Sequence, residues 1–216
     1  MGKIYFVSGI DTDAGKTYCT AWLAKQLNGK GIRTITQKFI QTGNSGRSED
    51  IELHRSIMGC GMLPEDRDFT TAPEIFSYPA SPLLASKIDK RPVDFEKINN
   101  ATKRLADKYD VVLVEGAGGL MVPLTENMLT IDFIAQSGYP LVFVTSGRLG
   151  SVNHTLLGLE AVAARNINLY MVMYNLYPAN PDTTISDDTR CYLRSYLGTR
   201  FPGTLWTEVP VINEVW

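Results

Sequence analysis

Residues 9–17 read Gly-Ile-Asp-Thr-Asp-Ala-Gly-Lys-Thr, a composition typical of a loop that holds phosphate groups. The usual loop places four residues between its first glycine and the closing Gly-Lys-Ser/Thr, whereas five residues separate Gly9 from Gly15. In such a loop the backbone N–H groups and the positive end of the following helix face the phosphates. Lys16 would supply a mobile cation, and the Thr17 hydroxyl would bind Mg²⁺. A glycine-rich turn that binds nothing is the disfavoured alternative, because an apolar run precedes the loop and a helical pattern follows it.

Two acids lie in this loop, where anionic phosphates are expected. Asp11 and Asp13 would repel a phosphate if their side chains pointed inward, so they must point outward, cap the loop or meet cations. One use for them is contact with a second substrate that carries an amine. The other is a turn that each acid caps through its own backbone. For Asp13 the sequence leaves both interpretations open.

A lysine and a glutamate follow two further apolar runs. Lys38 closes an otherwise apolar segment, which would place its charge at the edge of the core. Its side chain either extends to the surface or lies near Lys16 and faces an anion. Glu115 follows four apolar residues and precedes a glycine-rich turn. In P-loop enzymes a strand that ends in an acid binds Mg²⁺ opposite the loop threonine, and we assign this role to Glu115.

The elements that must position these residues are short apolar runs that alternate with helical patterns. The expected strands are Ile4–Val7, Thr34–Phe39, Val111–Val114, Leu141–Val144, Leu169–Tyr174 and Thr204–Val209. The expected helices are Lys16–Gly29, Phe95–Lys108, Ile131–Ser137, Val152–Asn166 and Asp187–Leu197. Most runs are continuous rather than alternating, as in strands that helices cover on both faces. We therefore predict a single α/β domain over residues 1–216, with an open, doubly wound, mostly parallel sheet. The proline-rich stretch 64–92 is expected to be a long connection with about one helical turn.

Composition narrows the class of protein further. The net charge of -2 provides no field that would attract nucleic acid or a lipid surface, so neither is an expected partner. The apolar run Ile4–Val7 is too short for a signal sequence or a membrane span. The 3 cysteines are widely spaced and form no Cys-x-x-Cys pair, which suits a reducing cytoplasm. We expect a cytoplasmic protein.

The loop at residues 9–17 and the sequence Glu-Gly-Ala-Gly-Gly at residues 115–119 resemble the motifs of the ATP-dependent dethiobiotin synthetases. The five-residue spacing and the Asp-Thr pair after the first glycine are the informative features. The related cobyrinic acid amide synthases share part of the loop. The resemblance implies a P-loop NTPase fold and the conversion of 7,8-diaminononanoate, CO2 and ATP into dethiobiotin, ADP and phosphate, with Mg²⁺. It also implies a homodimer with the substrate near the interface.

The resemblance assigns a role to each matching position. Lys16 and Lys38 are the expected catalytic cations, and Thr17, Asp50 and Glu115 are the expected Mg²⁺ ligands, with Glu49 as the alternative to Asp50. Lys16, Thr17, Asp50 and Glu115 are also expected to contact the nucleotide. The other expected nucleotide contacts are Asp13, Ala14, Gly15, Tyr18, Gly116, Ala117, Gly118, Asn175, Pro210, Val211 and Ile212. The expected substrate contacts are Thr12, Thr42, Gly150, Ser151, Val152 and Asn153.

Several of these assignments have a structural alternative. Asp50 is also placed where an acid merely favours the start of a helix, and Ser151 where a serine merely caps one. The two histidines, His54 and His154, are expected to be structural, and for His54 the sequence shows no acid–base partner.

The chain departs from the family pattern at three positions. Thr42 stands where the family has serine, Phe39 where a proline is common, and Leu176 where an aspartate usually follows Asn175. The predicted contact between Asn175 and the adenine base therefore lacks its usual acidic neighbour.

Other P-loop proteins remain as alternatives. A nucleotide kinase would have four-residue spacing and an arginine-rich lid, and an amide synthase would need a glutaminase domain for which 216 residues leave no room. A regulatory or partitioning-type ATPase that switches protein partners is the main rival, although such proteins commonly carry a lysine where Ile10 and Asp11 stand. ATP hydrolysis that depends on both diaminononanoate and bicarbonate would distinguish the synthetase.

Overall fold

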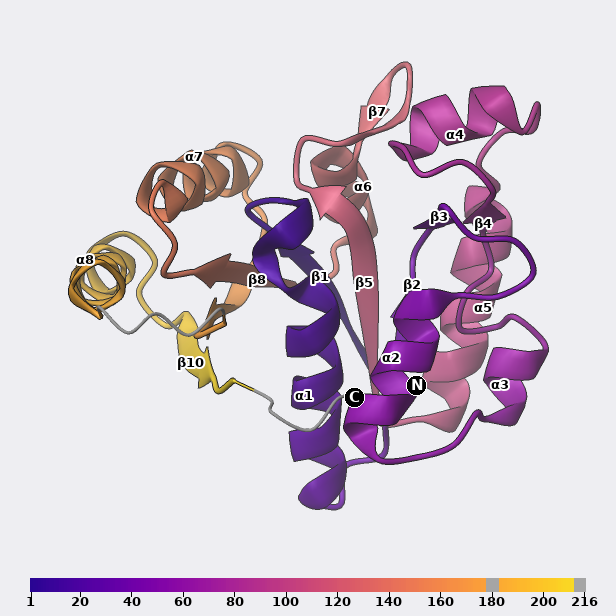
Figure 1. Cartoon of the computed structure of the whole chain (residues 1–216), viewed down its shortest axis with the longest axis horizontal. Helices are drawn as coiled ribbons and strands as arrows, with labels where there is room; N and C mark the ends of the chain where they lie inside the picture. The colour runs from indigo at the N-terminus through magenta and orange to yellow at the C-terminus, as the bar shows by residue number, and fades with distance from the viewer. Residues whose placement is uncertain (178–182, 212–216) are drawn as a thin grey trace.

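A six-stranded, fully parallel sheet forms the centre of the protein, in a computed structural model that describes residues 1–177 and 183–211 (Figure 1). The strand order is β10-β9-β8-β1-β5-β2. These strands are β1 (Lys3–Gly9), β2 (Thr34–Lys38), β5 (Val111–Gly119), β8 (Leu141–Ser146), β9 (Leu169–Asn175) and β10 (Leu205–Val209). All six correspond to the predicted apolar runs, and the predicted α/β architecture is confirmed.

Helices cover both faces of the sheet. They are α1 (Lys16–Gly29), α2 (Glu49–Met58), α3 (Pro64–Arg67), α4 (Pro82–Ile88), α5 (Phe95–Lys108), α6 (Thr130–Ser137), α7 (Ser151–Ala164) and α8 (Thr184–Arg200). One buried apolar cluster joins the sheet to α1, through residues such as Leu23 and Val142. The other joins the opposite face to α5, α6 and α7, through residues such as Leu105, Ile134 and Leu159. Burial on both faces explains why the strands read as continuous apolar runs.

The register of the three strands nearest the loop brings their ends together. Val7 of β1 and Lys38 of β2 are both paired with Glu115 of β5. The strand β5 therefore lies between β1 and β2. Its end, which carries Glu115, separates the end of β2 with Lys38 from the end of β1, which leads into the loop before Lys16. Because the strands are parallel, their functional residues gather at one edge of the sheet.

The stretch 64–92 has more regular structure than one helical turn. It contains α3, the short strand β4 (Ile75–Phe76) and α4. Strand β4 pairs in parallel with β3 (Gln41–Thr42), so that Thr42 lies opposite Phe76. The pairing partner lies more than thirty residues earlier, and this non-local contact is invisible to a local pattern. A second two-stranded unit, β6 (Pro123–Thr125) with β7 (Met128–Leu129), follows β5. Within the described residues, no helix combines the length and apolar character that crossing a membrane requires.

Candidate active site

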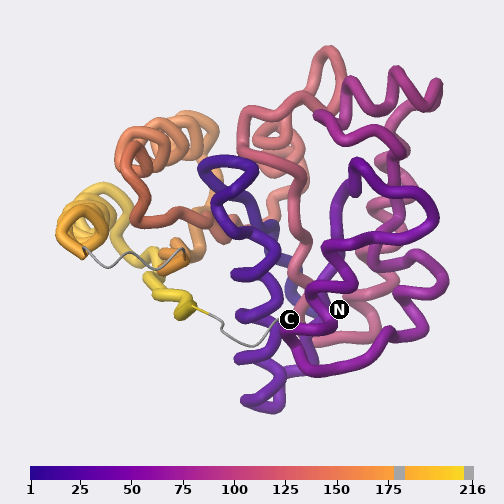
Figure 2. The backbone as a smooth tube through the Cα atoms, in the orientation of Figure 1, coloured from indigo at the N-terminus to yellow at the C-terminus, as the bar shows by residue number. Residues whose placement is uncertain are grey.

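The phosphate loop lies between β1 and α1, where Figure 2 shows the chain turning from the sheet into the helix. A short 3₁₀ turn, Thr12–Ala14, is followed by Gly15 with a φ of 84°, and α1 begins at Lys16. A side chain at Gly15 would collide with Asn175, since a Cβ atom there would lie 2.2 Å from the Asn175 amide nitrogen. Glycine is thus required both by the backbone conformation and by a close neighbour.

Lys16 is buried at the start of α1 and is directed back onto its own loop. Its Nζ donates to the carbonyl oxygens of Asp11, at 2.8 Å, and Thr12, at 3.1 Å. The pKa of Lys16 is lowered to about 8, mainly by burial; Glu115 opposes this shift and the nearby Lys38 adds to it. The ammonium is therefore still mostly charged at pH 7 but loses its proton slightly above neutral pH, and a nearby anion would raise the pKa again.

Lys38 and two carboxylates form a compact ion cluster beside this lysine. The Lys38 Nζ lies 2.6 Å from Asp50 Oδ2 and 2.8 Å from Glu115 Oε1. Burial by itself would lower the pKa of Lys38, but Glu115 and Asp50 raise it above its ordinary value. Burial would likewise raise the pKa of Glu115, but Lys38 and His54 hold it well below the ordinary range. The cluster is consequently charged at neutral pH.

The five residues predicted to carry the chemistry meet in one place. Thr17 Oγ1 donates toward Asp50 Oδ1, at 3.1 Å, and Glu115 Oε1, at 3.0 Å. Lys16, Thr17, Lys38, Asp50 and Glu115 all line a cavity of about 180 Å³, together with Thr12, Thr42, Ala117 and Gly118. The surface interpretation of Lys38 is excluded, because its side chain is buried.

His54 has the acid partner that the sequence did not reveal. It lies on α2, fully buried, with Nε2 2.7 Å from Glu115 Oε2. The spacing from Asp50 offered a signal, since residues four apart share one face of a helix. Asp50 itself lies in the first turn of α2, where the Ser48 side chain accepts a hydrogen bond from the Ile51 N–H. Asp50 thus lies at the helix start, as the structural interpretation expects, and its carboxylate contacts Lys38, while its predicted role as an Mg²⁺ ligand stays a prediction.

The expected base contacts lie around the far side of the loop. The Asn175 amide nitrogen donates to the Ala14 carbonyl at 3.2 Å, and its oxygen accepts from the Tyr177 N–H at 3.1 Å. The Tyr18 and Tyr177 rings are nearly parallel, with centroids 6.4 Å apart. Pro210 and Val211 directly follow β10, and Ile212 lies outside the described residues. In this arrangement Asn175 supports the loop, and its predicted contact with the base stays a prediction.

The remaining nucleotide positions differ in their surroundings. Asp13 is exposed within the 3₁₀ turn, whereas Ala14 is buried beneath it. Gly116 faces the Phe6 ring, where a Cβ atom would lie 2.9 Å from the ring carbon Cε1. Gly118 has a φ of 65°, a conformation that favours glycine.

Asp11 is directed away from the cluster and toward the start of α7. Its carboxylate accepts from the Thr12 N–H at 2.6 Å and forms an ion pair with Arg148. The backbone contact with Thr12 and the Arg148 guanidinium hold the pKa of Asp11 below its ordinary value. A neighbouring cavity of about 460 Å³ is lined by Asp11, Thr12, Met121, Leu157 and other residues of β5, β8 and α7. Thr12 thus lines both cavities.

The four substrate positions at the start of α7 are less close to the cluster. Gly150, Ser151, Val152 and Asn153 line neither of the two cavities. Gly150 precedes the helix with a φ of 93°, and the buried Ser151 hydroxyl contacts Ser146 Oγ at 3.1 Å. The Ser151 side chain does not cap the helix. The serine-cap interpretation is therefore wrong, and the backbone N–H groups of this turn are not occupied by that hydroxyl.

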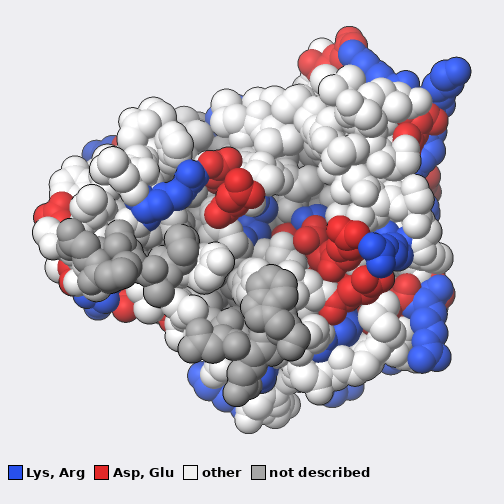
Figure 3. Space-filling view, viewed as in Figure 1, with Lys and Arg blue, Asp and Glu red and all other residues white. Residues whose placement is uncertain are grey.

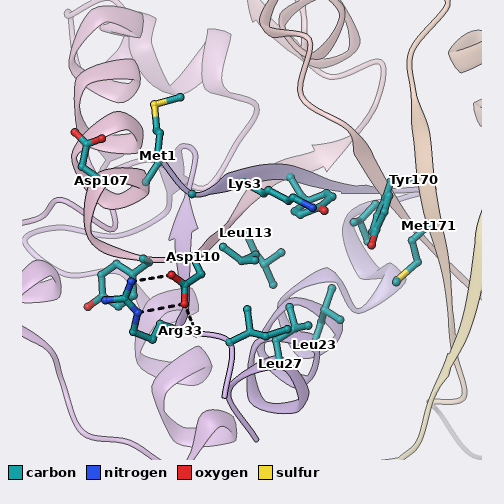
Figure 4. A pocket seen from close by; sticks show the side chains of 17 residues that line it. Met1, Lys3, Leu23, Leu27, Arg33, Asp107, Asp110, Leu113, Tyr170 and Met171 are labelled. Atoms are coloured by element: carbon teal, nitrogen blue, oxygen red, sulfur yellow. Dashed lines mark hydrogen bonds and ion pairs between the residues drawn. The ribbon is translucent and has the colours of Figure 1, made fainter. Parts of the chain in front are cut away.

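A larger cavity, of about 570 Å³, lies at the opposite edge of the sheet (Figure 4). Its lining includes Lys3, Leu27, Leu113 and Tyr170, and the Arg33–Asp110 ion pair lies at its border. Most of these residues lie at or near the amino ends of the strands, and Leu27 lies near the end of α1, whereas Lys38 ends β2 and Lys16 begins α1 at the carboxyl side of the sheet. The convergence of charged groups, rather than cavity size, is therefore the basis for placing the candidate active site at the carboxyl side of the sheet. Figure 3 shows acidic side chains over the start of α1 and over α2, with a hollow between them.

Comparisons with known proteins agree with this geometry. A family model described as an AAA domain matches residues 3–214. The chain is 46% identical over 213 residues to the ATP-dependent dethiobiotin synthetase BioD 2 of Pasteurella multocida, covering 99% of this chain and 100% of that protein. It is 52% identical over 178 residues to BioD 2 of Haemophilus influenzae, covering 82% of this chain and 93% of that protein.

Solved structures show the same fold at low sequence identity. A putative plasmid partition protein from Borrelia burgdorferi, bound to AMPPNP, matches with a TM-score of 0.56 and 13% identity, over 99% of this chain and 89% of that one. A ParA family ATPase from Chlorobium tepidum matches with a TM-score of 0.55 and 12% identity, over 99% and 86%. These similarities establish the architecture alone. The sequence similarity is far more specific, and from it we conclude that the chain belongs to the ATP-dependent dethiobiotin synthetase family.

Proposed function

We propose that this protein uses ATP to carboxylate 7,8-diaminononanoate and close it into dethiobiotin, in biotin biosynthesis. The observation that carries the proposal is the convergence of Lys16 and Lys38 on one cavity with Thr17, Asp50 and Glu115. It is the arrangement that phosphoryl transfer to a bound anion needs. Family membership supplies the identity of the substrates.

Three steps make up the reaction. One substrate amine attacks CO2, forms an N–C bond and loses a proton, which gives a carbamate. A carbamate oxygen then attacks the γ-phosphorus of ATP, and the bond to the bridging oxygen of ADP breaks. Finally the second amine attacks the carbamoyl carbon and loses a proton, the C–O bond to the phosphoryl group breaks, and phosphate leaves as the cyclic urea is formed.

The residues supply charge and position rather than a nucleophile. Lys38 is charged and buried beside the cavity, so its ammonium can face the carbamate and the transferred phosphoryl group. Lys16 needs only to rotate from its loop carbonyls to reach a phosphate, and that contact would favour its charged form. Positioning and charge neutralisation of this kind account for most catalysis of phosphoryl transfer.

Mg²⁺ fits the oxygen atoms at the floor of the cavity. Thr17 Oγ1 lies within 3.1 Å of an Asp50 oxygen and 3.0 Å of a Glu115 oxygen, which provides three hard donors in contact. No group of three or more His, Cys, Asp or Glu residues that could hold a metal occurs among the described residues. This agrees with Mg²⁺, which nucleotide enzymes bind through one or two carboxylates and the substrate phosphates. When bound, the ion would neutralise charge that develops on those phosphates.

The diamine is assigned to the cavity of about 460 Å³ beside the loop. Its lining combines apolar side chains, such as Leu157 and Met121, with the Asp11 carboxylate. Such a lining suits a molecule with an alkyl chain and amino groups. Thr12 connects this cavity to the cluster, so an amine placed there can reach the carbamate site.

A homodimer is part of the proposal. Leu149, Leu157 and Met121 are all largely exposed on or beside α7 and this cavity. A second copy that covered them would remove apolar surface from water and bring its own α7 start, residues 150–153, toward the substrate carboxylate. The three cysteines are free thiols, which suits the reducing cytoplasm where we expect the enzyme to act.

The deciding experiment measures ATP hydrolysis with and without diaminononanoate and bicarbonate, and identifies the product by mass spectrometry. We expect hydrolysis to require both compounds and dethiobiotin to form in equal amount to ADP. Hydrolysis that proceeds equally well without them would refute the proposal and favour a switch-type ATPase.

A further inference from the structure

His54 connects α2 to the carboxylate at the end of β5. Its imidazole is fully buried, and among residues 1–177 and 183–211 its side chain makes one hydrogen bond, to Glu115. The other ring nitrogen, Nδ1, is buried and has no partner within these residues. A buried polar atom without a hydrogen-bond partner lowers the stability of the folded protein. An apolar side chain would fill the same space without this cost, so packing alone does not explain a histidine at this position.

The direction of the hydrogen bond follows from its partner. Lys38 lies 2.8 Å from Glu115 Oε1, and a carboxylate that pairs with an ammonium is ionised and only accepts hydrogen bonds. Nε2 must therefore carry a proton and donate it to Oε2. This holds whether Nδ1 is protonated or not.

The two oxygens of Glu115 consequently have different surroundings. Oε1 accepts from Lys38 and Thr17, on the side of the phosphate loop. Oε2 accepts from His54, on the side of α2. The terminal torsion of a glutamate is broad and roughly two-fold, so a single free carboxylate would rotate among several orientations. The His54 contact fixes one of them.

We propose that His54 is a positioning residue that orients Glu115, so that Oε1 faces the metal ion and the nucleotide phosphates. The same ring ties α2 to β5 one helical turn after Asp50, and so it fixes the second acidic ligand as well. The inference rests on the proposed function for the identity of the metal–nucleotide complex. Partners that orient metal ligands typically contribute roughly 10- to 100-fold to metal affinity.

Direct metal binding tests the inference without the carboxylation reaction. Mn²⁺ replaces Mg²⁺ as a spectroscopic probe, and electron paramagnetic resonance measures its dissociation constant in the presence of a saturating non-hydrolysable ATP analogue. The variants are His54→Leu, which removes the donor, and His54→Gln, whose amide can donate in its place. Ile57→Val trims another buried side chain of α2 and serves as the matched control, because Ile57 has no polar contact with the site.

We expect His54→Leu to weaken Mn²⁺ binding by roughly 10- to 100-fold, and His54→Gln to recover most of that loss. Ile57→Val should bind Mn²⁺ as the parent protein does. Parent-like affinity in a folded His54→Leu protein would overturn the inference, and so would equal losses in all three variants. A failure of the carboxylation assay would refute the proposed function and leave these binding constants unaffected.

The parent protein provides a second test if His54→Leu does not fold. The chain has only 2 histidines, so the ring nitrogens can be assigned by ¹⁵N nuclear magnetic resonance. The inference requires a protonated Nε2 on His54, and a ¹⁵N shift there when Mg²⁺ and the nucleotide analogue are added. An unprotonated Nε2, or a resonance that does not respond to Mg²⁺, would refute it.

Discussion

Replacing Lys38 with methionine should destabilise the protein strongly, because the Glu115 carboxylate would remain buried without its cation. Lys38 Nζ lies 2.8 Å from Glu115 Oε1 and 2.6 Å from Asp50 Oδ2, and the Glu115 side chain is 1% exposed. Breaking a buried ion pair by removing one partner costs about 3–5 kcal/mol. Glu115 keeps His54 and Thr17 as donors, so we expect a loss of about 3 kcal/mol in the free energy of unfolding. For a chain of this length that corresponds to a decrease of roughly 6–12 °C in Tm.

A double-variant cycle isolates the charge contribution. Glu115→Gln added to Lys38→Met removes the orphaned charge, so the double variant should be more stable than the sum of the two single effects predicts. We expect a coupling free energy of about 1–3 kcal/mol, measured by urea unfolding at pH 7. Additivity within about 0.5 kcal/mol would refute the reasoning, because it would mean that the two groups do not interact.

The dependence on pH provides an independent check. In the parent protein the pKa of Glu115 is depressed, so its contribution to stability is present above its ordinary pKa of 4.5 and is lost as the pH falls. Without Lys38 that pKa should rise, and the folded variant should take up a proton at a higher pH than the parent does. The stability gap between parent and Lys38→Met should therefore narrow between pH 7 and pH 5. A gap that stays constant or widens would contradict the assignment.

Three further predictions concern the phosphate loop. The pKa of Lys16 is about 8 and phosphate favours its charged form, so nucleotide binding near pH 8.5 should be accompanied by uptake of a proton. Calorimetry in buffers of different ionisation enthalpy measures this uptake. Finding no proton uptake would mean that Lys16 is already charged without the nucleotide. Gly15→Ala should weaken binding of an ATP analogue by about tenfold or more, since its Cβ would lie 2.2 Å from Asn175 Nδ2. Gly31→Ala is the control for backbone strain, because Gly31 has a φ of 79° and a Cβ atom there would have no neighbour within 4 Å. Equal nucleotide affinity in the two variants would exclude the collision with Asn175 as the cause. Asp11→Asn should raise KM for the diamine by up to about fivefold and leave KM for ATP unchanged, because the ion pair with Arg148 is partly exposed; an unchanged diamine KM would remove Asp11 from the substrate site.

The residues at the ends of the strands could be predicted from the sequence, because in this fold a buried apolar strand has to end where the chain leaves the core. An apolar run covered on both faces must end where the chain emerges from the core, and a charged residue at that point is conspicuous. Lys38 and Glu115 were both found in this way, and parallel strands place such residues at one edge. The sequence could not show that β5 lies between β1 and β2, since strand order depends on contacts between distant segments.

Contacts that join distant segments explain what the sequence did not reveal. His54 meets Glu115 across 61 positions, and Asn175 meets Ala14 across 161. The spacing of His54 from Asp50 indicates which helix face it shares, but neither pairing partner can be read from a local pattern, because each depends on how one element docks against another. The roles carried over from the family resemblance, such as the base contact of Asn175, remain predictions. A structure with a bound nucleotide would test them.

The hydrogen bonds of Lys16 have a consequence for the choice of anion. Its ammonium donates to two carbonyl oxygens of its own loop, so an anion that binds Lys16 has to compete with both of them. An arriving anion must offer enough oxygen atoms to replace both carbonyls before the lysine gains by leaving them. A triphosphate has more oxygen acceptors than a single inorganic anion, so we expect the loop to bind it in preference.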